Sequence, residues 1–177
     1  MRKWIGSAVL VTMLAALPVA AHAQRRPAAR RPAATAAQRT SFGLQLDWGN
    51  DPNFGIGGRG VFPLGSLLPG TPLDGIVSFD YFFPGNNVKY WEINGNIAYR
   101  FRVPARSSLR PYAGGGLNIA HASVTFGGVS GSDTKAGLNV LGGTTFKVKG
   151  SNLLPFAEAR GEIGGGKTFI LTGGVRF

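Results

Sequence analysis

The sequence contains no cysteine and only two histidines among its 177 residues. Without cysteine the chain can form neither disulfide bonds nor thiolate metal sites. His22 falls in a segment that we expect to be removed, so one chain cannot supply a site made of several histidines. We therefore expect no metal and no other cofactor.

Long hydrophobic runs are absent after the first 23 residues, where no stretch approaches the roughly 18 apolar residues of a membrane-spanning helix. Glycine, by contrast, occurs 28 times, and this abundance argues against a helical protein. The length allows a single domain. These limits leave an all-β domain as the expected fold class.

Acidic residues are few, and the formal net charge is +11. Seven of the 19 basic residues lie within the first 39 positions, so the remainder carries 12 basic against 8 acidic residues. The positive charge thus clusters on a tail rather than on a folded face, and we expect no nucleic-acid partner.

The first 40 residues divide into two segments of different composition. Residues 1–23 have a basic start, an apolar core and a small-x-small triplet at Ala21-His22-Ala23, and they predict a cleaved secretory signal peptide. The alternative is a retained transmembrane helix. Residues 24–40 are rich in Ala, Arg and Pro without apolar periodicity, and predict a disordered periplasmic tail that serves as a spacer or as a tether to anionic lipid or peptidoglycan.

From Ser41 onward apolar residues alternate with polar ones, and turn residues recur every 8 to 14 positions. This period of two is typical of strands with one apolar face. It predicts eight strands, at about 41–49, 54–62, 74–83, 89–102, 109–123, 134–147, 154–163 and 167–177. A Gly/Ser loop is expected at 127–133, and a longer connection at 63–72. We predict an eight-stranded antiparallel up-and-down transmembrane β-barrel over residues 41–177.

Charged residues fall on the parity opposite the apolar face, where we expect them to form an interior network that has a structural role. The predicted members are Asp47, Arg59, Asp80, Glu92, Arg100, Glu158, Arg160, Glu162 and Arg176. An eight-stranded barrel encloses just enough space for side chains, so these charges are expected to pair across the interior. The competing interpretation is a narrow path for ions or protons.

Alternation alone does not separate a membrane barrel from a water-soluble, lipocalin-like one, because the two bury opposite faces. Aromatic residues near the strand ends favour the membrane, since they would form girdles at the two interfaces. The expected girdle comprises Phe42, Trp48, Phe62, Phe83, Trp91, Phe101, Phe146 and Phe177. We therefore expect an integral protein of the bacterial outer membrane.

Three segments resemble strands of small outer-membrane barrels of the OmpA/OmpX-like porin family: 110–117 (RPYAGGGL), 154–160 (LPFAEAR) and 171–177 (LTGGVRF). The resemblance covers residues 41–177. It implies a monomeric barrel with a structural role in the envelope and at most narrow permeability to small solutes. It also implies that Phe177 is an assembly signal read by the barrel-assembly machinery, and that outer-membrane lipids and lipopolysaccharide surround the barrel.

One motif points to another chemistry. His121-Ala122-Ser123 resembles the H-x-S of outer-membrane lipid A deacylases, in which a serine nucleophile and its histidine base face the lipid. The sequence places no acid beside the pair to orient the histidine. We expect no enzymatic activity, with a lipid A-modifying hydrolase and a small-solute channel as the alternative functions.

Overall fold

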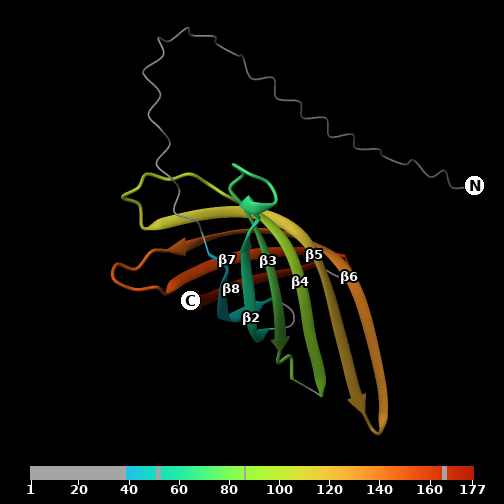
Figure 1. Ribbon diagram of the computed structural model, residues 1–177. Helices are drawn as coiled ribbons and strands as arrows, with labels where there is room; N and C mark the ends of the chain where they lie inside the picture. Colours follow the sequence, from blue (N-terminus) through green and yellow to red (C-terminus); the bar gives the residue numbers. More distant parts are fainter. Residues whose placement is uncertain (1–38, 51–52, 86, 165–166) are drawn as a thin grey trace, which may run out of the picture. The chain divides into compact units, whose positions relative to one another are not determined.

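The protein is described by a computed structural model over residues 39–50, 53–85, 87–164 and 167–177. The predicted signal peptide at 1–23 and almost all of the predicted tail at 24–40 lie outside the described residues. Eight antiparallel strands close into a barrel in sequence order (Figure 1). They are β1 (Ser41–Gly49), β2 (Phe54–Pro63), β3 (Leu73–Phe82), β4 (Val88–Arg100), β5 (Leu109–Phe126), β6 (Val129–Phe146), β7 (Leu154–Ile163) and β8 (Lys167–Arg176). The predicted fold class is confirmed.

The barrel closes between its first and last strands, which pair from Gly43 opposite Arg176 to Gly49 opposite Ile170. The end of the barrel that carries Ser41 and Phe177 also carries the connections 64–72, 101–108 and 147–153; we call it the terminal end. The four hairpin turns lie at the opposite, hairpin end. A short 3-10 helix, η1 (Leu64–Ser66), lies in the first of the connections. No helix in the described part of the chain has both the length and the hydropathy to cross a membrane.

The β5–β6 hairpin differs from the prediction, because the Gly/Ser segment at 127–133 is mostly strand. Only Gly127 and Gly128 form the turn, with φ of 57° and 84°, and Phe126 pairs directly with Val129. Positive φ at both central residues is what the tightest hairpin turn requires, and glycine adopts it without strain. β5 and β6 therefore run further than their neighbours at the hairpin end (Figure 1).

The alternating side chains divide the barrel into an apolar outside and a polar inside. Outward residues of β1 are large and exposed, such as Leu44 at 66%, whereas inward Asp47 is 1% exposed. The same alternation runs through β3 and β4, where Val77 and Ile93 face out and Asp80 and Glu92 face in. This arrangement is the reverse of a water-soluble barrel, which buries its apolar face.

Inward glycines provide room for the largest inward rings. Gly143 pairs across the sheet with Tyr112, and Gly174 pairs with Phe156. A Cβ at Gly143 would lie 2.7 Å from the Tyr112 ring, and one at Gly174 would lie 2.6 Å from the Phe156 ring. Each ring thus occupies the space that its partner's missing side chain leaves, which is how a narrow barrel accommodates aromatic residues.

Candidate functional site: the charged barrel interior

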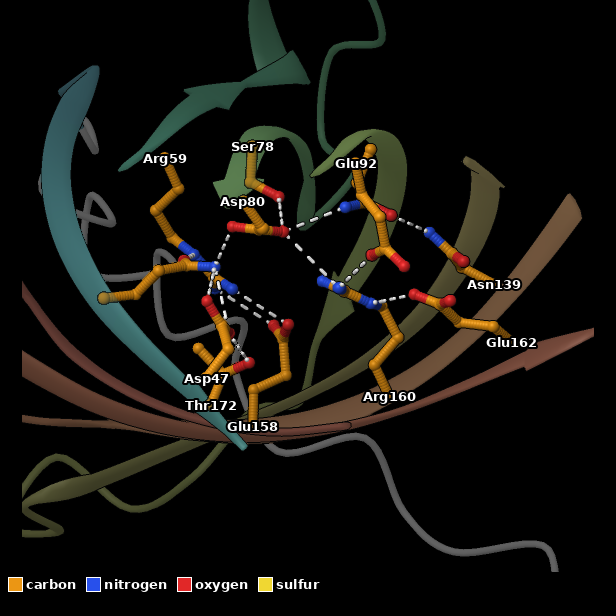
Figure 2. Close-up of polar contacts among 12 residues, drawn as sticks. Asp47, Arg59, Ser78, Asp80, Glu92, Asn139, Glu158, Arg160, Glu162 and Thr172 are labelled. Atoms are coloured by element: carbon orange, nitrogen blue, oxygen red, sulfur yellow. Dashed lines mark hydrogen bonds and ion pairs between the residues drawn. The ribbon is translucent and has the colours of Figure 1, made fainter. Parts of the chain in front are cut away.

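Eight of the nine predicted interior charges are buried inside the barrel. They are Asp47, Arg59, Asp80, Glu92, Glu158, Arg160, Glu162 and Arg176, each no more than 6% exposed. The ninth, Arg100, lies at the terminal end of β4 with its side chain 27% exposed. All eight buried charges except Arg176 form what we call the central network. Figure 2 shows Arg59, Asp80 and Glu92 reaching inward from one side, and Asp47, Glu158 and Arg160 from the other.

Arg160, on β7, holds three carboxylates together. Its Nη2 lies 3.1 Å from Oε2 of Glu92 and 3.4 Å from Oδ2 of Asp80, while its Nε donates to Oε1 of Glu162 at 2.8 Å. Asp80 and Glu92 are themselves opposite each other on β3 and β4. One guanidinium thereby joins strands on opposite sides of the barrel (Figure 2).

Arg59 and Glu158 form the second ion pair of the central network, and it is bidentate. Nη1 and Nη2 of Arg59 donate to the two Glu158 oxygens at 3.0 Å and 2.9 Å. The Tyr112 hydroxyl donates to Glu158 Oε2 at 2.8 Å, and the Arg59 guanidinium stacks on the Phe156 ring at 4.2 Å. Each of the two buried charges thus has a partner of opposite sign. Burying either charge without such a partner would be costly in free energy.

Neutral polar side chains complete the central network, and the sequence analysis did not single them out. Gln45 Nε2 donates to Asp80 Oδ1 at 2.7 Å, and Thr172 Oγ1 donates to Asp47 Oδ1 at 2.6 Å. Ser78 and Asn94 each donate to Asp80 Oδ2 at 3.0 Å. Their position on the inward parity of their strands was the available signal. These donors stabilise Asp47 and supplement the contact of Arg160 with Asp80.

Two predicted arginines do not join the central network. Arg100 pairs with Asp74 at 3.0 Å, and Arg176 donates to the hydroxyl oxygens of Thr145 and Ser41 at 3.0 Å and 3.4 Å. The central network therefore contains five carboxylates and two guanidinium groups. Asp74 was missed because it stands at the first position of the predicted strand, although it shares the inward parity of Asp80.

An apolar layer also fills part of the interior, and the sequence analysis did not predict it. Val61, Ile76, Ala98, Tyr112 and Leu141 form one buried cluster. Phe82 and Ile170, both 0% exposed, lie inward near the hairpin end. The interior therefore combines ion pairs with close-packed apolar side chains.

No group of three or more His, Asp or Glu side chains within the described ranges is arranged to hold a metal ion. The carboxylates of the central network are directed instead at arginines, amides and hydroxyls. The contacts of this donor set are ion pairs and hydrogen bonds.

The His121 and Ser123 pair has its neighbours on strands β4 and β6. His121 Nδ1 lies 2.8 Å from Thr134 Oγ1, and its ring stacks on Trp91 with 5.1 Å between the centroids. Ser123 stands opposite Ser132 on β6. The contacts of the histidine are thus to a hydroxyl and an aromatic ring of neighbouring strands.

Phe177 continues the pairing of the closing strand. Its backbone N–H donates to Phe42 O at 2.8 Å, and Phe42 N–H donates to Phe177 O at 3.2 Å. Its side chain is 63% exposed. The last residue is therefore held in the sheet while its ring faces outward with the other aromatics of the terminal end.

Several solved structures are similar to this chain, among them two small barrels. The N-terminal β-barrel domain of Pseudomonas aeruginosa OprF matches with a TM-score of 0.61 at 18% sequence identity, covering 78% of this chain and 97% of that one. Neisserial surface protein A matches with a TM-score of 0.54 at 21% identity, covering 77% of this chain and 94% of that one. The chain has the fold of the small outer-membrane β-barrels. No protein-family model and no curated protein matches its sequence.

Proposed function

We propose that the protein is an integral outer-membrane barrel with a structural role in the bacterial envelope, and that its interior admits at most small solutes. The observation that carries the proposal is the inside-out distribution of side chains. Large apolar residues are exposed around the barrel wall, while ion pairs and amides fill the interior. Such a wall is stable in hydrocarbon and would aggregate in water.

The aromatic residues support a position across the bilayer. Phe42 and Phe62 contact each other at the terminal end, and Phe54 and Phe83 stack at the hairpin end. Rings at both ends of the apolar wall are typical of the girdles of membrane barrels. We place the terminal end in the periplasm and the hairpin end outside the cell.

The packing of side chains inside the barrel favours a closed interior over an open channel. A buried apolar cluster around Ile76 and Leu141 occupies part of the interior, and ion pairs such as Arg59–Glu158 and Arg160–Glu92 join side chains across another part. We regard the barrel as a monomer whose partners are outer-membrane lipids, lipopolysaccharide and, during biogenesis through Phe177, the barrel-assembly machinery. The contacts of His121 give no support to the lipid A-hydrolase alternative.

Cell fractionation combined with gel mobility tests the location. The protein should be recovered with the outer membrane, and the folded barrel should migrate differently on SDS gels before and after boiling, because strand pairing keeps it compact until heated. Recovery in the soluble periplasm would reject the proposal.

Solute uptake by reconstituted liposomes tests the closed interior. We expect no uptake of sugars above that of protein-free vesicles. Rapid uptake of sugars would favour the channel alternative, and release of acyl chains from labelled lipid A that is lost on Ser123→Ala would favour the hydrolase.

A further inference from the structure

The outer wall of the barrel is hollowed over β6, β7, β8 and β1. The hollow has a volume of about 740 Å³, and Gly142, Ala157, Ala159 and Gly173 lie on its floor. Trp48 and Leu171 stand at its side. It arises because the four outward positions on its floor carry small residues, whereas outward positions on β3 and β4 carry side chains such as Phe79 and Ile97.

The strand register fixes the course of the hollow. Gly142 stands opposite Ala159, Ala159 opposite Leu171, and Leu171 opposite Trp48. A parallel row runs from Thr144 through Ala157 and Gly173. The hollow therefore crosses the wall obliquely, from the last residues of β6 at the terminal end toward the last residues of β1 at the hairpin end.

Exposed cations gather beside the terminal end of the hollow. The connections 101–108 and 147–153 lie side by side, with Lys147 N–H donating to Ser108 O at 2.8 Å. Together with the start of β5 they carry five exposed basic residues and no acidic one: Arg102, Arg106, Arg110, Lys147 and Lys149. We call these residues the terminal basic cluster. Thr144 precedes Lys147 by three residues, or about 10 Å of extended strand.

We infer that the hollow and the terminal basic cluster together bind an anionic phospholipid of the surrounding membrane. Its phosphate lies among the cations and an acyl chain lies in the hollow. A bilayer leaflet has a hydrocarbon depth of about 15 Å, so a phosphate near Lys147 directs the chain onto Thr144, Ala157 and Gly173. The negative headgroup complements a cluster that lacks acids, and the chain fills a hollow that lacks bulky side chains. This inference rests on the proposed membrane location.

A tryptophan placed at the site tests the inference. In the full chain, Trp4, Trp48 and Trp91 are replaced by Phe, and Phe146→Trp provides a single reporter beside the hollow. Phe62→Trp is the matched control, because Phe62 and Phe146 are both 37% exposed and both lie at the terminal ends of strands. Each protein is reconstituted in phosphatidylcholine bilayers that contain phosphatidylglycerol, with bromine on the acyl chains of one lipid at a time.

Brominated phosphatidylglycerol should quench the Phe146→Trp reporter more than its share of the lipid predicts, and more than it quenches the Phe62→Trp reporter. Quenching of both reporters in proportion to lipid composition would overturn the lipid site and leave the membrane location intact. No quenching by either lipid would reject the membrane location itself and the lipid site with it.

Two further pairs of variants separate the headgroup from the chain. Lys147→Gln with Lys149→Gln should reduce the preference for phosphatidylglycerol by on the order of fivefold for each cation removed, whereas Lys89→Gln at the hairpin end should leave it unchanged. Gly173→Leu should displace the acyl chain from the hollow, and Gly95→Leu should not. The two glycines are a matched pair, because a Cβ at either one meets no atom within 4 Å. Equal effects from the members of a pair would contradict the assignment.

Discussion

Arg160 is the residue on which the barrel interior most depends. It is 1% exposed and pairs with Asp80, Glu92 and Glu162, which come from three strands. Removing the guanidinium would leave three buried carboxylates without their cation. Leaving one charge of a buried pair without its partner is far more costly than losing an exposed pair.

We predict that Arg160→Met lowers the free energy of unfolding by about 3–5 kcal/mol. Urea titration of the protein in bilayers, followed by tryptophan fluorescence, measures this change. The control is Lys135→Met, which removes an exposed pair with Asp133 and should cost no more than about 1 kcal/mol. Similar losses in the two variants would show that the interior pairing contributes little.

Adjacent glycines in β8 give a second test at the scale of single residues. A Cβ at Gly174 would collide with Leu44 O and the Phe156 ring, whereas one at Gly173 meets no atom within 4 Å. Gly174→Ala should therefore destabilise the barrel by about 1–3 kcal/mol, as overpacking does. Gly173→Ala should change stability by no more than about 0.5 kcal/mol. The same urea titration distinguishes them, and a harmless Gly174→Ala would contradict the tight packing.

Among the elements, β6 is unusual because its two halves have different neighbours. β5 pairs with it from Val129 to Phe146, whereas β7 pairs only with Leu138 to Thr145 over the residues that the structure describes. The half of β6 near the hairpin end therefore has one strand partner, and the other half has two.

Hydrogen exchange should reveal this difference within one strand. We expect every second backbone amide of 129–137, those that point away from β5, to exchange hydrogen much faster than the amides of 138–145. An amide without a hydrogen bond to a neighbouring strand has little protection from exchange. Exchange measured by NMR in detergent micelles checks the prediction. Uniform protection along β6 would indicate that another segment covers its edge.

The strands themselves were predictable from sequence, because a barrel wall imposes a strict period of two. β1 and β7 begin and end where the alternation predicts. The β5–β6 turn was not predicted, because the Gly/Ser composition of 127–133 is typical of a loop, whereas pairing with β5 makes 129–133 part of a strand. Inward positions of Asp80 and Glu92 followed from parity, but which acid meets which arginine depends on strand register and barrel closure, which no local pattern encodes.

The molecule as a whole is defined by its reversed surface. Large apolar side chains cover the outside from β1 to β4, and small ones cover much of β6 to β8. The middle of each strand is therefore suited to contact with hydrocarbon, and the connections are suited to contact with water. A charge introduced in the middle of a strand should destabilise the barrel, whereas a charge introduced in a connection should not.

Leu171→Arg tests this contrast. Leu171 faces outward on β8, and an arginine there should destabilise the barrel by about 2–4 kcal/mol if it lies at the bilayer midplane. The control, Leu67→Arg, changes a 75% exposed leucine in the 64–72 connection and should cost less than about 0.5 kcal/mol. The fraction of each variant that keeps its fast mobility on unboiled gels reports the outcome. Equal tolerance of both substitutions would argue for a water-soluble barrel.

The ion pairs of the interior join residues that are far apart along the chain, 99 positions for Arg59 and Glu158 and 80 for Asp80 and Arg160. Both pairs depend on β7, the seventh strand of the barrel. A chain that stops before β7 carries Asp80, Glu92 and Arg59 without their counter-ions, so it gains nothing by burying them. The placement of these charges thus makes burial of the interior conditional on β7, because that strand supplies Glu158 and Arg160, the partners of Arg59 and Glu92.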